Sequence, residues 1–454
     1  MSIQNVIKNN YCIGCGACSY KNNKITLEWD EYGILKPQGN IDELDDEICP
    51  FSSHHNETSI ADSLYGEVDS LSFHQKVGYY HEIFAGYASE GNYRENASSG
   101  GLTTWLLVEL MSKKLIDGVI HVGASKSNEQ LYTYSISESI EDIKLKTRSQ
   151  YYPTKFDNAL ENIDSRKKYA VVGIPCYIKA IRLLCKKNDE LNISLKYFIG
   201  IFCGHLKTKA FSELLSWQQG ILPSNLRHIN FRVKNSFGTA SRYSIKVTSS
   251  SGVERMAQTG HLYGTDWGLG LFKPEACEWC DDIAAEVADV VFGDAWLPKY
   301  VSDPKGTNIV LSRNLEISSL LKEAAGAERL FLEHIDVDDV IHAQAGNYRH
   351  RQEGLLIRIK DADLEKKWHP QKRDFLLPTK VDENRKEIYR IRKIISSKSH
   401  AIFFEAKKKN NLMFFFYKMA FHEVKYRILT KSLIKNSIKH IYFIANYLKR
   451  KGVK

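Results

Sequence analysis

Three of the nine cysteines in this 454-residue chain lie close together near its N-terminus. Cys12, Cys15 and Cys18 have the spacing C-x-x-C-x-x-C, and the next cysteine, Cys49, is followed directly by a proline. Two-residue gaps allow three thiolates to surround one metal centre, and the intervening glycines let the backbone turn tightly. These four cysteines therefore predict a metal site, either a 4Fe-4S cluster or a four-cysteine zinc site.

The order of these cysteines favours iron and sulfide over zinc. Zinc sites prefer two separated C-x-x-C pairs, whereas a triple completed by a remote Cys-Pro is typical of iron–sulfur clusters. The segment resembles half of a bacterial-type ferredoxin, in which the cysteine four residues after the third serves a second cluster; here that residue is Asn22. We therefore expect a ferredoxin-type module over residues 1–60 that holds one cluster.

Four further cysteines predict a second metal site. Cys176 follows the apolar run "YAVVGIP", Cys203 follows "LKYFIGI", and Cys277 and Cys280 form another C-x-x-C pair. In an open α/β sheet, residues just beyond the carboxyl ends of strands meet at one edge. We expect a second 4Fe-4S cluster here; a zinc ion could use the same ligands, or only some of the four could bind while Cys176 or Cys203 is a packing residue or redox thiol. Cys185, inside a predicted helix, is left over as a buried apolar residue.

A turn rich in small residues predicts a phosphate site. In "ENASSGGLTTWLL", Ser98, Ser99, Gly100 and Gly101 directly precede an apolar helical pattern. Small residues let a phosphate approach the backbone, and a helix N-terminus favours negative charge. An ordinary helix N-cap is the alternative. The turn matches neither the Walker A loop nor the G-x-G-x-x-G fingerprint, so ATP hydrolysis and a standard nicotinamide-binding domain are poorly supported.

Other residues are candidates for contacts with a cofactor. Arg148 and Tyr151 lie in "LKTRSQYYPTKF" and could bind phosphate or pack on a ring, with a solvated basic loop as the alternative. Asp294, in "FGDAW" after the strand "ADVVF", is a candidate catalytic or flavin-contacting residue, with a turn aspartate or N-cap as the alternative. His205 could hydrogen-bond a cluster sulfur, although a structural role is the simpler interpretation.

The helices and strands expected around these residues indicate a multidomain α/β protein. After the module at 1–60, we expect a mixed α/β core that binds flavin and the second cluster, in two parts, 75–160 and 161–325. The strand-rich segment from "LRHINFRVKN" to "GVERMAQ" predicts an antiparallel insertion into this core. A linker or extension at 326–378 and a basic helical tail at 379–454 complete the chain.

Composition and charge narrow the class of protein. Hydrophobic residues at 43% and charged residues at 26% are ordinary globular values. No secretion signal and no apolar run of about 20 residues is visible, so we expect a cytoplasmic protein. The net charge of +9 comes from the tail: from Lys380 onward 20 basic against five acidic residues give +15, which leaves −6 for the rest. A nucleic-acid surface on the main body is therefore disfavoured.

The tail leaves two alternatives open. Arg427, Lys431, Lys435 and Lys439 recur at steps of four, which gives a helix a basic stripe beside an apolar face. Such a helix can lie peripherally on an anionic membrane, here the inner face of the cytoplasmic membrane. A helical hairpin packed on the main domain with its lysines in water fits equally well.

Taken in order, several motifs resemble the coenzyme F-420 hydrogenase/dehydrogenase beta-subunit family over residues 8–315. They are "CIGCGAC" with "CP", "SSGGLTTWLL", "VVGIPCYIKAIRLL", "FCGH", "FRVKN", and "CEWCDDIAAEVADVVFGDAW" followed by "GTNIVLSR". The resemblance implies FAD near Ser98 to Gly101, iron–sulfur clusters, and electron exchange with a reduced carrier such as a deazaflavin or ferredoxin. No residue matches a deazaflavin pocket, so the use of F-420 itself stays open.

These observations predict an iron–sulfur flavoprotein oxidoreductase. A flavin can link donors of electron pairs to clusters that carry one electron. We expect electrons to pass between a reduced carrier or redox protein and an unknown small-molecule or lipid-linked substrate through the clusters and FAD. Surface-polysaccharide synthesis, found among bacterial members of the family, is one setting. The alternatives are a noncatalytic electron-transfer subunit of a larger complex and a zinc-stabilised interaction protein.

Overall fold

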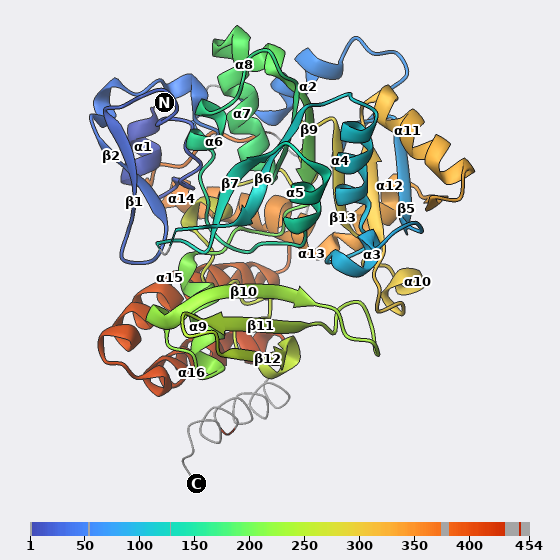
Figure 1. The fold of residues 1–454 in the computed structure, drawn as a ribbon. Helices are drawn as coiled ribbons and strands as arrows, with labels where there is room; N and C mark the ends of the chain where they lie inside the picture. Colours follow the sequence, from blue (N-terminus) through green and yellow to red (C-terminus); the bar gives the residue numbers. More distant parts are fainter. Residues whose placement is uncertain (1, 53–54, 128, 374–380, 432–444, 446–454) are drawn as a thin grey trace.

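The computed structural model describes residues 2–52, 55–127, 129–373, 381–431 and 445. Figure 1 shows a central sheet with helices on both sides and, below it, a smaller antiparallel sheet packed with the C-terminal helices. The predicted mixed α/β class is confirmed for this central layer.

The central sheet has eight strands in the order β15-β5-β14-β13-β9-β8-β6-β7. Its middle strands β6, β8, β9 and β13 run parallel, and β7, β14 and β15 pair antiparallel to their neighbours. The strands are β5 (Glu82–Ala88), β6 (Gly118–Ala124), β7 (Tyr132–Ser137), β8 (Tyr169–Gly173), β9 (Leu195–Ile201), β13 (Val290–Asp294), β14 (Asn308–Ser312) and β15 (Leu330–His334).

Helices cover both faces of this sheet, which explains why β8 and, apart from the exposed Lys196, β9 are apolar. Val171 of β8 packs with helix α7 (Pro175–Lys187) on one face, while its neighbour Ala170 packs with α4 (Leu102–Ser112) and α11 (Leu315–Gly326) on the other. Pro175 opens α7, where its fixed φ and missing N–H suit the first helical turn. The shorter helices are α2 (Glu57–Tyr65), α3 (Tyr93–Asn96), α5 (Ile140–Leu145), α6 (Asp157–Glu161), α8 (Asp189–Ser194) and α10 (Pro298–Val301).

The N-terminal module is a helix and a hairpin packed on the core. It contains α1 (Ile3–Lys8) and the antiparallel strands β1 (Ile25–Trp29) and β2 (Leu35–Gly39). A second small hairpin, β3 (Ser72–His74) with β4 (Gly78–Tyr80), follows α2. The Phe156 amide donates to the Cys15 carbonyl at 2.9 Å. Gly16, at φ +98°, lies so close to the Asp157 backbone that a Cβ would stand 3.0 Å from its nitrogen.

A second core lies around the smaller sheet. Strands β10 (Leu226–Val233), β11 (Ser244–Ser249) and β12 (Glu254–Gln258) form it, which confirms the predicted antiparallel insertion. Helices α9 (Lys209–Gln218), α15 (Glu383–Lys408) and α16 (Leu412–Leu429) bury their apolar residues against it. Residues 383–429 thus form a hairpin packed on the main body, one of the two alternatives left open for the tail.

The prediction that Arg427 belongs to an exposed basic stripe of the tail is wrong. Arg427 is 7% exposed and pairs with Glu423 inside the protein, because α16 turns this face toward the smaller sheet. Lys435 and Lys439 lie outside the described residues.

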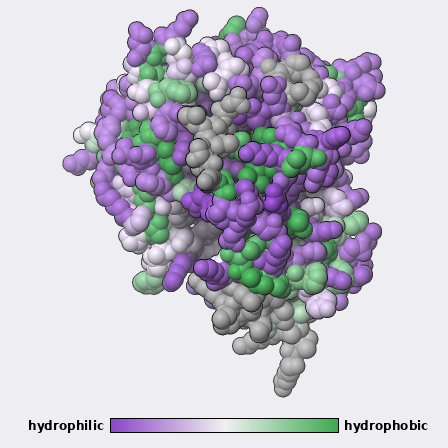
Figure 2. Space-filling view, turned by 180° about the vertical axis from the view of Figure 1, so that it is seen from behind, coloured by the Kyte–Doolittle hydropathy of each residue, from purple (hydrophilic) through white to green (hydrophobic). Residues whose placement is uncertain are grey.

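Within the described part of the chain, no helix combines the length and apolarity needed to cross a membrane. Figure 2 shows hydrophilic side chains over much of one face, with apolar side chains in smaller groups between them.

The segment that we treated as a linker or extension, 326–378, is largely helical where the structure describes it. After β15 it forms α12 (Val337–Ala343), α13 (Ala345–Tyr348), one π-helical turn η6 (Arg349–Glu353) and α14 (Gly354–Leu364). Tyr348 and Leu355 join the large core together with the N-terminal module. This segment is therefore part of the body that surrounds the cysteines.

Candidate functional site

The four cysteines of the N-terminal module, here called the outer quartet, line one small pocket: Cys12, Cys15, Cys18 and Cys49. Burial raises the pKa of all four thiols, that of Cys49 to about 12, and other members of the quartet raise the pKa values of Cys15, Cys18 and Cys49 further. Buried thiols of this kind lose their protons only when a cation compensates the charge. The donor set therefore fits a metal–thiolate centre.

Local hydrogen bonds hold the outer quartet in place. The Gly14 amide donates to the Cys12 sulfur at 3.3 Å, and the Lys36 ammonium donates to the Cys12 carbonyl at 3.3 Å. Gly14, at φ +64°, permits the tight turn, because a Cβ there would stand 2.5 Å from the Leu35 carbonyl oxygen. Cys12 and Cys18 are partly exposed, so this quartet reaches the surface.

The second set, here called the inner quartet, is Cys176, Cys203, Cys277 and Cys280, and the fold brings it together from three segments. Cys176 begins α7 just after β8, and Cys203 lies just after β9, the parallel neighbour of β8. Cys176 and Cys203 therefore lie just beyond the ends of neighbouring parallel strands, as the sequence predicted. Burial, followed by the other thiols, raises the pKa of Cys176, and burial raises that of Cys280 to about 11.

The two quartets are neighbours. Cys15 of the outer quartet is close enough to Cys176 of the inner quartet to raise its pKa. Tyr134 and Tyr177, stacked at a centroid distance of 6.0 Å, lie within range of both cysteines. Among the described residues, no three His, Cys, Asp or Glu side chains converge closely enough to hold a single metal ion. The assignment of both quartets as cluster ligands stays a prediction.

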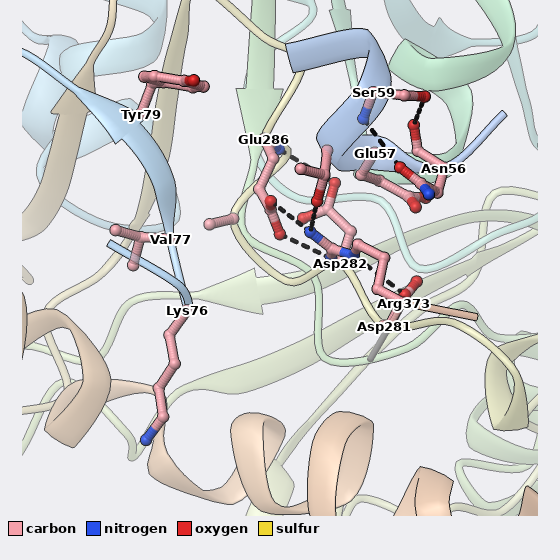
Figure 3. A network of polar contacts seen from close by, with 12 residues as sticks. Asn56, Glu57, Ser59, Lys76, Val77, Tyr79, Asp281, Asp282, Glu286 and Arg373 are labelled. Carbon is pink, nitrogen blue, oxygen red and sulfur yellow. Dashed lines mark hydrogen bonds and ion pairs between the residues drawn. The ribbon is translucent and has the colours of Figure 1, made fainter. Parts of the chain in front are cut away.

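A network of buried charges includes Asp281 and Asp282, which directly follow Cys280 in the chain (Figure 3). Arg373 donates to Glu286 at 2.6 and 2.9 Å and to Asp281 at 3.2 Å. Burial and the charges of Glu286 and Glu57 raise the pKa of Asp282 to about 8. The network holds the chain after Cys280 against α2, and its charges are largely balanced within it.

Sequence reasoning missed a cation at the inner quartet. Arg351, in η6, is 1% exposed, and its Nη2 lies 3.7 Å from the Cys203 sulfur. The segment "NYRHRQEG" holds two arginines, and no cysteine near it in the sequence could have indicated this contact for Arg351.

A cavity of about 1130 Å³ opens beside the inner quartet and brings most of the other candidates together. It exceeds the ~300–1,000 Å³ usual for one small ligand, so there is room for a cofactor and a second molecule. The predicted residues that line it are Ser98, Ser99, Gly101, Arg148, Tyr151, Cys203, His205 and Asp294. Gly100 is the exception, since it faces the protein: a Cβ there would stand 2.6 Å from the Gly86 carbonyl oxygen.

The Ser-Ser-Gly-Gly turn begins α4 as predicted. Gly101 precedes the helix at φ +85°, and the Asn308 side-chain oxygen accepts from the Leu102 amide at 3.2 Å. The Ser98 hydroxyl oxygen accepts from the Ser149 amide at 2.9 Å. Thr103 and Thr104, which the sequence did not single out, add two hydroxyl-bearing side chains to the cavity wall.

Cations surround this turn. The Lys234 ammonium donates to the Ser99 carbonyl at 2.7 Å, and burial lowers its pKa to about 7. Arg148 donates to the Asn96 carbonyl at 3.0 Å and has a φ of +77°, a conformation that non-glycine residues adopt mainly at functional sites and turns. A turn of small residues, a helix N-terminus and two cations together suit a phosphate group.

The other end of the cavity carries an ion pair and aromatic rings. Arg232 Nη1 donates to Asp294 at 2.7 Å, so Asp294 is paired with a cation rather than free in the cavity. Tyr151 packs edge-on against Trp267 at a centroid distance of 5.0 Å. In the described part of the chain, three buried polar atoms on the lining residues lack a hydrogen-bond partner: Gln150 Oε1, His205 Nε2 and Arg232 Nε. They fit a polar ligand with a ring system, as a flavin has.

Two family models match long stretches of this chain. Residues 83–161 match the model for the N-terminal part, and residues 166–338 the model for the C terminus, of the coenzyme F-420 hydrogenase/dehydrogenase beta subunit. The F-420-dependent formate dehydrogenase subunit beta of Methanocaldococcus jannaschii is 35% identical over 121 residues, which cover 26% of this chain and 31% of that protein.

Two further relatives and one structure match over longer stretches. The coenzyme F-420 hydrogenase subunit beta of Methanococcus voltae is 22% identical over 50% of this chain and 79% of that protein. An uncharacterized protein of M. jannaschii is 24% identical over 68% of this chain and 86% of its own length. A chain from a structure of the F-420-reducing NiFe hydrogenase complex of Methanosarcina barkeri matches with a TM-score of 0.49 and 16% identity, over 65% of this chain and 97% of that chain.

Proposed function

Since this chain belongs to the coenzyme F-420 hydrogenase/dehydrogenase beta-subunit family of oxidoreductases, we propose that it is an iron–sulfur flavoprotein that transfers electrons. In this proposal the outer and inner quartets each hold a 4Fe-4S cluster, and the large cavity holds FAD. The family membership supports the redox role; the assignment of ligands rests on the geometry of this chain.

One observation carries the proposal: Cys203 of the inner quartet and the Ser98–Gly101 turn line the same cavity. A dinucleotide with its phosphates at the turn would therefore share a cavity with the inner quartet. The outer quartet adjoins the inner quartet where Cys15 lies near Cys176, and it is partly exposed through Cys12 and Cys18. Electrons can thus enter or leave at the surface.

The residues have distinct proposed roles toward FAD. Ser98, Ser99 and Gly101, with the cations Arg148 and Lys234, would hold the phosphates. Tyr151 would pack beside the ring system, and FAD would link two-electron and one-electron carriers. Gly100 supports the turn through its packing against Gly86 and Asn308.

Asp294 is proposed to act through its partner. Its carboxylate holds Arg232 in the cavity with one N–H of the guanidinium free of a hydrogen-bond partner in the described structure. That N–H can donate to an acceptor on the flavin ring or on a substrate. Asp294 is therefore a positioning residue in this proposal rather than a general base.

The proposal also covers the electron carrier and whether the chain works alone or as a subunit. The reduced carrier would be a deazaflavin such as F-420 or a ferredoxin. Two relatives are named as beta subunits of F-420-linked enzymes, which favours a second candidate: an electron-transfer subunit that needs another chain for substrate chemistry. None of the relatives named above is described as acting in polysaccharide synthesis, so the proposal does not include that role. Peripheral membrane contact through the tail stays a prediction.

Analysis of the protein purified without oxygen tests the assignment. We expect about eight iron and eight sulfide per chain, as two 4Fe-4S clusters require, together with one FAD. Zinc without iron and flavin would instead support a zinc-stabilised protein. Reduction of an artificial acceptor by the isolated chain, with reduced F-420 or reduced ferredoxin as the donor, then distinguishes an enzyme from a subunit that needs a partner.

A further inference from the structure

Arg351 makes an unusually complete set of contacts around the inner quartet. Its Nη2 lies 3.7 Å from the Cys203 sulfur and donates to the carbonyls of Cys203 at 3.3 Å and Gly204 at 2.8 Å. Its Nε donates to the Gly204 carbonyl at 3.1 Å, and its Nη1 donates to the Asp282 carbonyl at 3.2 Å. The guanidinium is thus fixed in position and directed at a proposed cluster ligand.

The backbone that presents Arg351 is itself unusual. Residues Arg349–Glu353 form a π-helical turn between α13 and α14. Such wide turns are rare and often occur at functional sites. Seven residues farther along, Arg358 donates to the carbonyl of Glu278, which lies between the two cysteines of the C-x-x-C pair, at 2.9 Å. This segment therefore contacts the backbone within and just after the inner quartet's C-x-x-C pair and just after β9.

The charge of Arg351 lacks a carboxylate partner in the described structure. Arg358, which is also buried, pairs with Glu278 at 3.2 Å. Burial lowers the pKa of Arg313, which bonds only to carbonyls, and nearby acidic side chains partly offset that effect. The leading groups that raise the pKa of Arg351 are all cysteines: Cys280, Cys203, Cys277 and Cys176. A buried unpaired guanidinium is costly, so the thiolate form of the inner quartet is its natural counter-charge.

We propose that Arg351 sets the reduction potential of the inner cluster, an inference that rests on the proposed iron–sulfur function. Reduction adds one negative charge to a cluster. A permanent positive charge beside the Cys203 sulfur, in an interior of low polarity, stabilises the reduced state more than the oxidised state. Arg351 therefore raises the potential of the inner cluster, and it acts through charge rather than by supplying a ligand.

Two substitutions separate this role from a purely structural one. Arg351→Gln keeps hydrogen-bond donors for the carbonyls but removes the charge, whereas Arg351→Lys keeps the charge. The measurement is a potentiometric titration of the holoprotein followed by electron paramagnetic resonance. We expect Arg351→Gln to lower the potential of the inner cluster by at least 59 mV, a tenfold change in the oxidised-to-reduced ratio at a fixed solution potential. In Arg351→Lys, the potential of the inner cluster should change by less than those 59 mV.

The outer cluster of the same molecule is the internal control, and its potential should not change. An inner-cluster signal with an unchanged potential in Arg351→Gln overturns the role of Arg351, and so does an equal fall in both variants. If the glutamine variant does not fold, a fall of more than tenfold in the lysine variant still overturns it. Wild-type protein that shows no inner-cluster signal overturns the proposed function itself, so the two failures are distinguishable.

Discussion

The Arg232 guanidinium lies 2.7 Å from the Asp294 carboxylate at the wall of the cavity. Burial alone would lower the pKa of Arg232, but the charge of Asp294 outweighs it and raises that pKa. Arg232 is therefore charged at neutral pH, and the pair presents a fixed cation to the cavity rather than a free carboxylate.

We expect Asp294→Asn to reduce electron transfer more than it reduces stability. The substitution leaves Arg232 without its anionic partner, so the guanidinium loses its fixed direction, and we expect at least a tenfold lower rate with an artificial acceptor. Asp303→Asn is a matched control, because Asp303 pairs with Arg94 at the same 2.7 Å but does not line the cavity. Equal losses of rate in both variants would contradict a role for the Asp294 pair.

The two quartets should lose iron independently. Cys49→Ser removes one thiolate from the outer quartet, and we expect iron to fall from about eight to about four per chain while the flavin stays bound. Cys203→Ser should remove the other four. Cys185→Ala is the control, since this buried cysteine belongs to neither quartet and should keep the full iron content. Iron analysis and electron paramagnetic resonance measure the outcome; loss of iron in the Cys185 variant would argue against the assignment.

Gly101 should be much less replaceable than Gly220. The two glycines have nearly the same φ, +85° and +86°, but a Cβ at Gly101 would stand 2.6 Å from the Tyr93 backbone while one at Gly220 meets nothing within 4 Å. The left-handed backbone costs about 1–2 kcal/mol in either alanine variant. Gly101→Ala should in addition displace the turn and lose most of its FAD. Flavin content and urea midpoints test this, and similar flavin content in both variants would refute it.

Stability should depend on pH through Lys207. Burial lowers the pKa of this lysine to about 7, whereas an unfolded lysine titrates near 10.5. Between these values the unfolded chain binds more protons, so this group adds stability as pH rises from about 7 toward 10.5. Lys207→Met removes the effect. Between pH 7 and pH 9.5, we expect the urea midpoint of the wild type to rise relative to the urea midpoint of the variant. A constant difference between the two would exclude it.

The grouping of the cysteines could be predicted from the sequence because the signals for it are local. C-x-x-C spacing and the apolar strands before Cys176 and Cys203 are visible in the chain, and parallel pairing of β8 with β9 then brings these residues together. Arg351 could not be predicted, since its role depends on how a helical segment after the core packs against the C-x-x-C turn. Its neighbours in the sequence give no sign of that contact.

The tail shows why a charge pattern alone is insufficient. A step of four residues correctly indicated a helix at Arg427, but it could not say which face turns inward. In the structure, Arg427 pairs with Glu423, which also accepts from Tyr263, so tertiary contacts decide the orientation. The turn at Ser98 was more predictable, because small residues before an apolar helix form a local signal.

The N-terminal module is attached to the core by more than a linker. Backbone hydrogen bonds join Cys15 to Phe156 and Gly33 to Lys209, each at 2.9 Å, and the module shares its apolar core with α7. Electron tunnelling between the two quartets would therefore occur across a fixed gap, without the swinging of a tethered carrier domain. Solvent viscosity should then affect the arrival of an external partner but not the internal transfer.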